Sequence, residues 1–306
     1  MPAHYNHPAD FLLEAVERAG SPVCVGLDPV WERLPDAVRR AVSTPPPALE
    51  RFCVEVIDAV HNIAACIKFQ AACFERYGAA GWSALEAAIA HARQRNNQLC
   101  VILDAKRGDI GISVEHYAAM AKNIGTHWIT ANPYLGVDCL QPFLGAGLGV
   151  FALVRTSNPG SAAIQSQKLD AGNTVAQHIA AQVAARGAGH LGSCGYSALG
   201  AVVGATHPED AAEFRSIMGQ QIFLVPGYGA QGAGADDVRA CFNDKDASAT
   251  GSASGAIITA SRSVIYAFDD TDAKDDWQSA VANAATRFAH EIRNILPAPD
   301  SPRAHA

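Results

Sequence analysis

Val101-Ile102-Leu103-Asp104-Ala105-Lys106-Arg107-Gly108-Asp109-Ile110 is a stretch in which an apolar run ends in a cluster of charges. The run of Val, Ile and Leu is typical of a buried strand. If the strand continues through Asp104 and Lys106, their side chains leave the same face and can meet over one small ligand. An ordinary solvated ion pair at a strand end is the alternative. Asp109 lies beyond the strand and is expected to point elsewhere.

Similar apolar runs recur along the whole chain. Eight candidate strands begin near residues 23, 65, 99, 127, 149, 201, 222 and 256. Segments with helical spacing lie between them, at residues 49–62, 83–95, 114–123, 174–186, 208–217 and 236–242. Alternation of this kind predicts parallel strands joined by crossover helices, and eight such units fit a closed (β/α)8 TIM barrel in the α/β class. An open doubly wound sheet is the alternative architecture.

No composition shift separates two folding units, so we expect a single barrel domain over residues 1–306. Its additions are an N-terminal extension at residues 1–21 and a flexible C-terminal tail at 297–306. Other irregular segments are a proline-rich interruption of the first connection at 43–47, a long fifth connection at 157–172 and a flexible loop at 243–255. Residues 272–296 have the pattern of an amphipathic terminal helix, with a solvated acidic start at 269–276.

Composition narrows the classes of function. The chain has 306 residues, of which 49% are hydrophobic and 17% charged, so it can bury a large core. A net charge of -7 with scattered Lys and Arg argues against nucleic-acid or anionic-membrane partners. The eight cysteines form no C-x-x-C pair, which indicates reduced and mostly buried thiols. Neither an apolar signal segment nor a membrane-length apolar run is present, so a cytoplasmic enzyme with a small-molecule substrate is expected.

The ends of the first three strands carry charges that could form a reaction centre. Reacting groups in a parallel barrel gather at the C-terminal ends of the strands. The first strand ends in Asp28, the second delivers Lys68, and the third delivers Asp104 and Lys106. Alternating charges can satisfy one another where any one alone would be costly to bury. A purely structural role for Lys68, as the partner of Asp104, is the alternative.

The loops after strands seven and eight suggest a phosphate site. Residues 226–232 satisfy G-x-G-x-x-G, but they follow the seventh strand, whereas a dinucleotide fingerprint follows the first strand of its unit. Glycines also let backbone N–H groups approach a phosphate, and Arg262 after the eighth strand offers a planar donor fork. Barrels often bind phosphate at this place, so a phosphorylated ligand is favoured over two plain turns.

Further motifs are weak or missing. The polar residues 156–160 after the fifth strand could read the amide or carbonyl groups of a ring, although a cap or turn explains them as well. The chain has no G-x-S-x-G, H-E-x-x-H or G-x-x-x-x-G-K-[ST] motif, so serine hydrolase, zincin and P-loop functions lack support. The 11 histidines are dispersed, and we assign none of them to metal binding or catalysis.

Taken in order, these motifs resemble the orotidine 5'-phosphate decarboxylase family from Pro22 to Ala267. The matching set is Asp28, Lys68, Asp104-x-Lys106-x-x-Asp109-Ile110, Pro226-Gly227-x-Gly229-Ala230-Gln231-Gly232 and Ser261-Arg262. The form Asp-Ala-Lys-Arg-Gly-Asp-Ile, in a chain of this length, is similar to the longer bacterial branch of that family.

The resemblance implies a role for each matching residue. The catalytic array would be Lys68, Asp104, Lys106 and Asp109, with Asp109 and Ile110 reaching into the neighbouring subunit of a homodimer. Asp28 and Lys68 would contact the ribose hydroxyls, and Ser157 would read the pyrimidine edge, a role that Thr156 or Asn158 could share. The remaining substrate contacts would come from Pro226, Gln231, Ser261 and Arg262. Gln231 would lie between base and phosphate. Arg262 and the backbone beside Ser261 would bind the phosphate.

The implied reaction converts orotidine 5'-monophosphate (OMP) to UMP and CO2, the last step of de novo pyrimidine biosynthesis, without a metal or organic cofactor. Lys106 would stabilise the C6 carbanion and then protonate it. One alternative is a Mg-dependent sugar-phosphate lyase or decarboxylase of the same superfamily, but those enzymes carry an acidic metal ligand where this chain has Lys68. A non-catalytic phosphate-binding barrel is the other alternative, and it gives no reason to keep the four charges together.

Overall fold

The protein forms a closed barrel of parallel strands in a computed structural model that describes residues 6–42, 44–205, 208–229, 234–243, 255–270 and 276–296. The strands follow one another around the barrel in sequence order, and β8 pairs with β1. They are β1 (Val23–Leu27), β2 (Cys66–Gln70), β3 (Cys100–Arg107), β4 (Trp128–Ala131), β5 (Gly149–Arg155), β6 (Ser197–Val203), β7 (Gln221–Val225) and β8 (Ala256–Ala260). The TIM barrel expected from the sequence is therefore confirmed.

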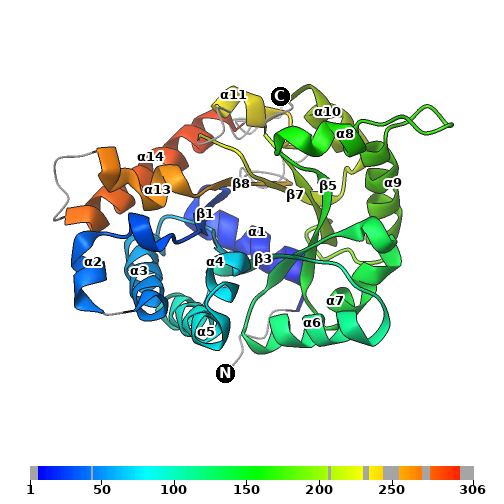
Figure 1. The fold of residues 1–306 in the computed structure, drawn as a ribbon. Coiled ribbons are helices and arrows are strands. Elements are labelled where there is room, and N and C mark those ends of the chain that lie inside the picture. The colour runs from blue at the N-terminus through cyan, green and yellow to red at the C-terminus, as the bar shows by residue number, and fades with distance from the viewer. Residues whose placement is uncertain are drawn as a thin grey trace.

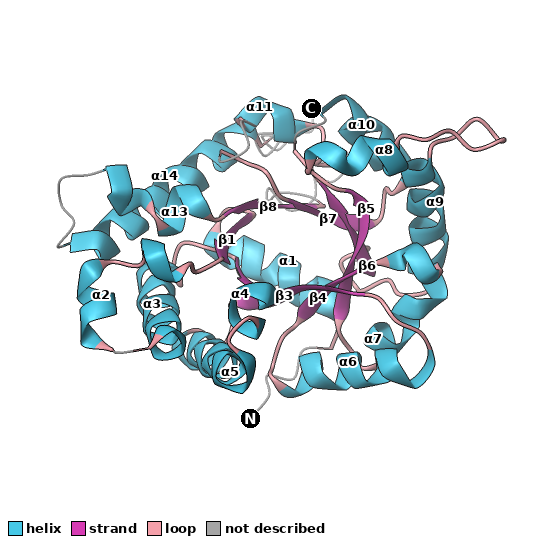
Figure 2. Ribbon diagram, in the orientation of Figure 1, coloured by secondary structure: helices cyan, strands magenta, loops and turns pink. Residues whose placement is uncertain are grey.

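Helices surround the strands, as Figures 1 and 2 show. The longer ones are α1 (Pro8–Ala19), α3 (Pro45–Val60), α5 (Gly78–Arg95), α6 (Gly111–Asn123), α9 (Val175–Gly187), α10 (Pro208–Ile217) and α14 (Trp277–Ile295). Short helices occupy the connections: α2 (Asp36–Ala41), α4 (Ala71–Glu75), α7 (Gln141–Gly145), α8 (Ala162–Gln165), α11 (Ala235–Arg239) and α13 (Arg262–Ile265). Single 3-10 turns span Trp31–Arg33, Pro133–Leu135, Val137–Leu140, Pro159–Ser161 and Ala267–Asp270. None of the described helices is long and apolar enough to cross a membrane.

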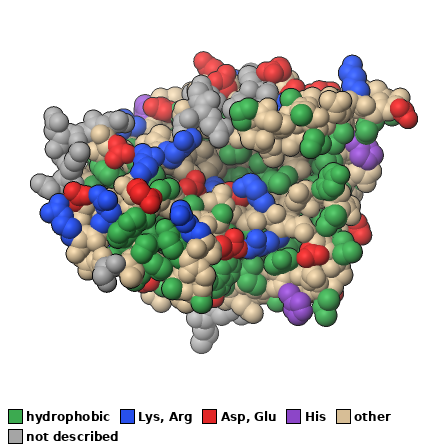
Figure 3. Space-filling model, in the orientation of Figure 1, with side chains coloured by type: hydrophobic (Ala, Val, Ile, Leu, Met, Phe, Trp, Pro, Cys, Tyr) green, Lys and Arg blue, Asp and Glu red, His purple; other side chains and the backbone are tan. Residues whose placement is uncertain are grey.

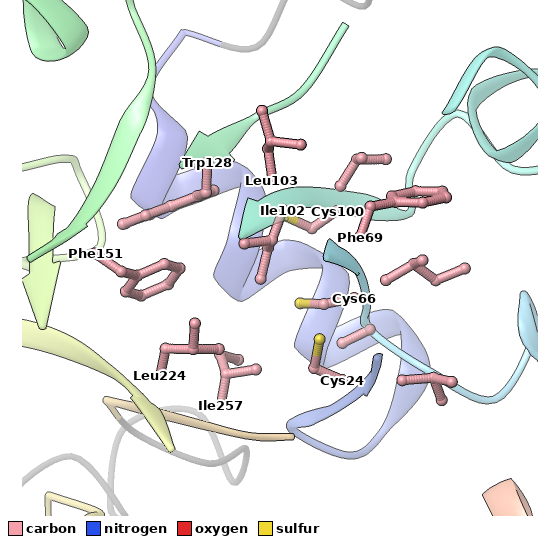
Figure 4. Packing of buried hydrophobic residues seen from close by; sticks show 14 of the residues in the cluster. Cys24, Cys66, Phe69, Cys100, Ile102, Leu103, Trp128, Phe151, Leu224 and Ile257 are labelled. Atoms are coloured by element: carbon pink, nitrogen blue, oxygen red, sulfur yellow. The ribbon is translucent and has the colours of Figure 1, made fainter. Parts of the chain in front are cut away.

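The strands are apolar because both of their faces are buried, one inside the barrel and one under the helices. Cys24, Cys66 and Cys100 occupy matching positions on three neighbouring strands, and all three are fully buried. Trp128 stacks on Phe151 with a ring separation of 4.3 Å, and Figure 4 shows both residues in the same buried cluster as the three cysteines. All eight cysteines are free in the structure, and six of them are buried, which confirms the expectation of mostly buried thiols.

The N-terminal end of the barrel is covered by α1, which is visible through the barrel in Figure 1. Trp128 Nε1 donates a hydrogen bond to Pro8 O, at 3.3 Å. The Asp10 carboxylate accepts hydrogen bonds from the backbone N–H groups of Ser193 and Cys194, at 3.0 and 2.8 Å. Partial burial would raise the pKa of Asp10, but the hydrogen bonds from Cys194 and Ser193 lower it to about 2. The segment expected as an extension thus contains a helix bonded to the barrel.

The structure refines two expected element boundaries. The first connection is interrupted between α2, which ends at Ala41, and α3, which begins at Pro45. The prolines 45–47 themselves form the first turn of α3, because proline suits a first helical turn whose N–H groups have no helical partner. The terminal helix begins at Trp277, with the Asp276 side chain accepting from Ser279 N, and not at residue 272. Residues 244–254 of the loop expected at 243–255, residues 271–275 of the acidic segment expected at 269–276, and the whole tail 297–306 lie outside the described residues.

Candidate active site

Three strands bring four charges together at the C-terminal mouth of the barrel. Lys68 Nζ lies 3.0 Å from Asp104 Oδ2 and 3.5 Å from Asp28 Oδ1, while Lys106 Nζ lies 2.6 Å from Asp104 Oδ1. The side chains of Lys68 and Asp104 are buried, whereas that of Lys106 is 47% exposed and open to a ligand. The predicted meeting of Asp104 and Lys106 on one face is confirmed, and these groups form one continuous network of alternating charge.

The network keeps its buried members ionised. Burial alone would raise the pKa of the Asp104 carboxyl, but the charges of Lys68 and Lys106 hold that pKa well below its usual range. Burial alone would lower the pKa of the Lys68 ammonium, but the attraction of Asp104 and Asp28 raises it above its usual range. Asp104 and Lys68 therefore both carry their charges at neutral pH.

The backbone at Lys106 departs from a regular strand. Lys106 has φ of 48°, and it is the one non-glycine residue with positive φ among the described residues. The pairing of β3 with β4 shifts register between Leu103 and Arg107, at the same place. Thr130, on β4, donates from Oγ1 to Asp104 Oδ1 at 2.8 Å and accepts from Lys106 N at 2.9 Å. Thr130 could not be assigned to the site from the sequence, because in the sequence it is one more β-branched residue of an apolar strand.

The charges face a cavity of about 750 Å³. Eight of the residues singled out from the sequence line it: Asp28, Lys68, Asp104, Lys106, Ser157, Pro226, Ser261 and Arg262. Figure 3 shows blue and red side chains together in the middle of the corresponding face of the molecule. The cavity walls also include apolar side chains, among them Leu153, Val202 and Leu224. A site of this kind can enclose a ring against apolar walls and hold its polar groups at fixed points.

One side of the cavity is formed by the segment after β5, which a buried arginine holds in place. Arg155 Nε lies 2.9 Å from Asp210 Oδ2 of α10, and Arg155 Nη1 donates to Ser161 Oγ at 3.2 Å. Thr156 N donates to Gln165 Oε1, and Gln165 Nε2 donates back to Thr156 Oγ1. These bonds fix both ends of the short segment that carries Ser157.

Ser157 lies between Thr156 and Asn158 at the centre of that segment. Thr156 Oγ1 donates to Asn158 Oδ1 at 2.7 Å, so these two neighbours are bonded to each other. Within the described chain no hydrogen bond involves the Ser157 hydroxyl. Gly204 lies directly behind Ser157, and a Cβ at Gly204 would lie 2.8 Å from the Cβ of Ser157. The backbone therefore leaves Ser157 at the cavity edge.

The opposite side of the cavity is formed by the ends of β7 and β8. Arg262 begins α13 directly after β8 and is exposed, while Ser261 is half-buried. The Ser261 side chain crosses over Gly26 of β1, where any Cβ would overlap with Ser261 Oγ. Pro226 lies at the end of β7, next to the positive-φ glycine Gly227. Gln231, expected between base and phosphate, lies outside the described residues.

Tyr266, another residue that the sequence did not mark, connects this side to Asp28. Its hydroxyl accepts from Val30 N at 2.8 Å and donates to Asp28 O at 3.3 Å. Its own N–H donates to Arg262 O at 3.2 Å. Tyr266 thus braces the loop that carries Asp28 against the helix that begins with Arg262.

Asp109 and Ile110 are not brought to the charge network within a single chain. Asp109 makes no ion pair there among the described residues, and its Oδ1 accepts from Ile110 N at 2.8 Å. Ile110 is 66% exposed, and neither residue lines the cavity.

Comparison with known proteins agrees with this geometry. The family model described as orotidine 5'-phosphate decarboxylase / HUMPS family matches residues 21–275. The chain belongs to this family. It is 40% identical over 301 residues to the orotidine 5'-phosphate decarboxylase of Rhodopirellula baltica, covering 91% of this chain and 96% of that protein. The relative of the same name from Clostridium perfringens is 34% identical over 294 residues, covering 94% and 99%. The structure of Leishmania donovani OMP decarboxylase aligns with a TM-score of 0.74 at 31% identity, covering 94% of this chain and 98% of that one.

Proposed function

We propose that this protein decarboxylates OMP to UMP and CO2, the last step of de novo pyrimidine biosynthesis, and that it does so in the cytoplasm. The observation that carries the proposal is the alternating network of Lys68, Asp104 and Lys106 in a cavity that Arg262 also lines. Membership of the family and relatives named for this reaction support it.

The cavity offers a partner for each part of OMP. Arg262 and the backbone beside Ser261 would hold the phosphate, where a guanidinium can bond in a bidentate way. Asp28 and Lys68 would bond the ribose hydroxyls. Ser157 would meet the pyrimidine edge with its hydroxyl, which makes no hydrogen bond within the described part of the chain. By the resemblance, Pro226 and Gln231 would complete the contacts between base and phosphate.

The network accounts for the reaction at C6. The C6–carboxylate bond breaks, CO2 leaves, and the electron pair stays on C6, where the ammonium of Lys106 stabilises it. Lys106 then transfers a proton to C6 to give UMP, and the neutral amine takes a proton back from water. Asp104 is ionised and bonded to both lysines, so it would hold Lys106 in place and repel the substrate carboxylate until CO2 departs. Binding of the remote phosphate would supply energy for ordering the site.

A Mg-dependent sugar-phosphate lyase is the second candidate in this superfamily, and Lys68 argues against it. An ammonium bonded to Asp104 and Asp28 occupies the place where an acidic metal ligand would stand. Among the described residues no group of three or more His, Cys, Asp or Glu side chains could hold a metal ion. We expect the purified protein to consume OMP in the presence of EDTA, followed as a change in ultraviolet absorbance. Unchanged OMP would contradict the proposal, and activity that required added Mg²⁺ would favour the lyase.

We further propose that the working form is a homodimer in which Asp109 and Ile110 contribute to the partner's site. Exposed apolar side chains lie on two neighbouring segments at the rim: Ile110, Ile112, Tyr134 and Leu135, which are 54–79% exposed. Asn132 N donates to Arg107 O at 2.7 Å and joins these segments. An apolar rim of this kind suits burial against a second copy.

Complementation between two inactive variants tests the shared site. Lys106→Ala and Asp109→Ala should each lose most of their turnover while keeping the fold, as judged by circular dichroism. Mixed dimers of the two should regain part of the activity, because some would contain one intact site. Absence of rescue in demonstrated mixed dimers would contradict the shared site, and near-normal turnover of Lys106→Ala would remove that lysine from the mechanism.

A further inference from the structure

Thr130 contacts both members of the reacting pair. It lies on β4 with only 1% of its surface exposed. Its Oγ1 donates to Asp104 Oδ1 at 2.8 Å, and the same carboxylate oxygen is 2.6 Å from Lys106 Nζ. The Oγ1 atom also accepts from Lys106 N at 2.9 Å. One hydroxyl therefore closes a ring that runs through the Asp104 carboxylate, the Lys106 ammonium and the Lys106 backbone.

The backbone of Lys106 needs such support. A side chain with a Cβ disfavours the left-handed region, and residues held there persist only when their surroundings fix them. Lys106 is in that region, where the β3–β4 ladder shifts register, so its N–H group takes a side-chain acceptor on the neighbouring strand. Threonine is suited to this task, because its branched Cβ restricts the rotation that would move the hydroxyl away.

We infer that Thr130 is a positioning residue for the decarboxylation, which orients Asp104 and holds Lys106 in the backbone conformation that places its ammonium against C6. The inference rests on the proposed function and deepens it. Thr130 itself need not touch the substrate: its effect passes through the two charged residues. Loss of the hydroxyl should therefore reduce turnover, while the binding of phosphate and ribose, which uses other residues, stays nearly unchanged.

Three substitutions separate this role from simple packing. Thr130→Val keeps the shape but removes the hydroxyl, and we expect kcat to fall roughly ten- to a hundredfold, as for a displacement of about 1 Å at a reacting group. The KM for OMP and the inhibition constant for UMP should stay within about threefold, because ground-state binding is retained. Thr130→Ser restores the hydroxyl and should return kcat to within about fivefold of the wild type. If Thr130→Val does not fold, Thr130→Ala, which introduces no buried methyl beside Asp104, carries the same test.

Thr126→Val is the matched control. Thr126 is also buried just ahead of β4, and its hydroxyl donates to Ala121 O at 2.8 Å, away from the charges. Thr126→Val removes this hydroxyl and should lower the thermal stability about as much as Thr130→Val does, while kcat stays unchanged. A Thr130→Val enzyme with kcat within about threefold of the wild type, or a Thr130→Ser enzyme as impaired as Thr130→Val, would overturn the inference.

A crystal structure of Thr130→Val tests the geometric part without any assay of turnover. Lys106 should leave the positive-φ conformation, or its Nζ should move away from Asp104 Oδ1. An unaltered Lys106 would overturn the positioning role even if kcat fell. By contrast, a wild-type protein that does not consume OMP would overturn the proposed function, and the crystal structure would still decide whether Thr130 holds Lys106.

Discussion

Acid should destabilise this barrel through one buried histidine. His127 is 2% exposed and lies just before β4. Its ring Nδ1 accepts from Val101 N at 2.9 Å, and its backbone N–H donates to Val101 O at 2.9 Å. Burial, with the charges of Arg93 and Lys122 in support, lowers the pKa of His127 from 6.5 to about 3. The folded protein therefore holds this ring neutral over a pH range in which the unfolded chain protonates it.

The sign and size of the effect follow from that difference. Above pH 6.5 the ring is neutral in both states and the free energy of unfolding does not depend on it. As the pH falls below 6.5, His127 is protonated in the unfolded chain but stays neutral in the folded protein. The free energy of unfolding therefore decreases by about 1.4 kcal/mol per pH unit until the pH reaches the pKa of His127 in the folded protein. Between pH 7 and pH 5 the expected loss is about 2 kcal/mol.

The comparison protein is His127→Asn, whose side-chain oxygen can accept from Val101 N but does not titrate. Urea denaturation followed by tryptophan fluorescence at pH 7, 6 and 5 would give the free energy of unfolding of both proteins. The wild type should lose about 2 kcal/mol more than the variant over this range, because all other titrating groups are common to both. Parallel pH dependences would refute the assignment of the acid sensitivity to His127.

Two further substitutions test how the ligand-binding loops are held. Tyr266→Phe keeps the buried ring but removes the hydroxyl that bonds Val30 N and Asp28 O. The KM for OMP should therefore rise about three- to tenfold with little change in kcat. An unchanged KM would show that the position of Asp28 does not depend on this hydroxyl. Gly26→Ala places a methyl group where the Ser261 side chain lies and should weaken inhibition by UMP at least about tenfold. Gly145→Ala is the control, because Gly145 has open space around it, and it should leave the inhibition constant unchanged. Equal inhibition constants for the two variants would contradict the close approach at Gly26.

Much of the fold could be predicted because each strand is buried on both faces. Runs such as Val101 to Leu103 stand out from their surroundings for that reason, and the alternation of runs with helical segments determines the topology. The topology in turn predicts which charges meet, since the ends of parallel strands share one mouth. Asp28, Lys68, Asp104 and Lys106 were found in this way, and the ion pairs of the structure show that they meet.

The rest depends on contacts that no local pattern records. Thr130 has the sequence surroundings of an ordinary strand residue. Its importance comes from its hydrogen bond to Asp104 on the neighbouring strand β3. The left-handed backbone conformation of Lys106 could not be predicted from the sequence either. Glycine is the residue that usually adopts this conformation, and Lys106 is held in it by tertiary hydrogen bonds. Helix α1 was missed because its sequence follows a polar terminus, and its place is set by distant partners such as Trp128.

The cover that α1 forms over the far end of the barrel has a consequence for the order of events in a catalytic cycle. Substrate and both products of the proposed reaction would have to pass through the mouth lined by Lys106 and Arg262. CO2 would be released beside the Asp104 carboxylate, which is more buried than Lys106, and would leave while the phosphate is still bound at Arg262. While UMP occupies this cavity the next OMP cannot bind beside Asp104, so the departure of UMP would gate each new turnover.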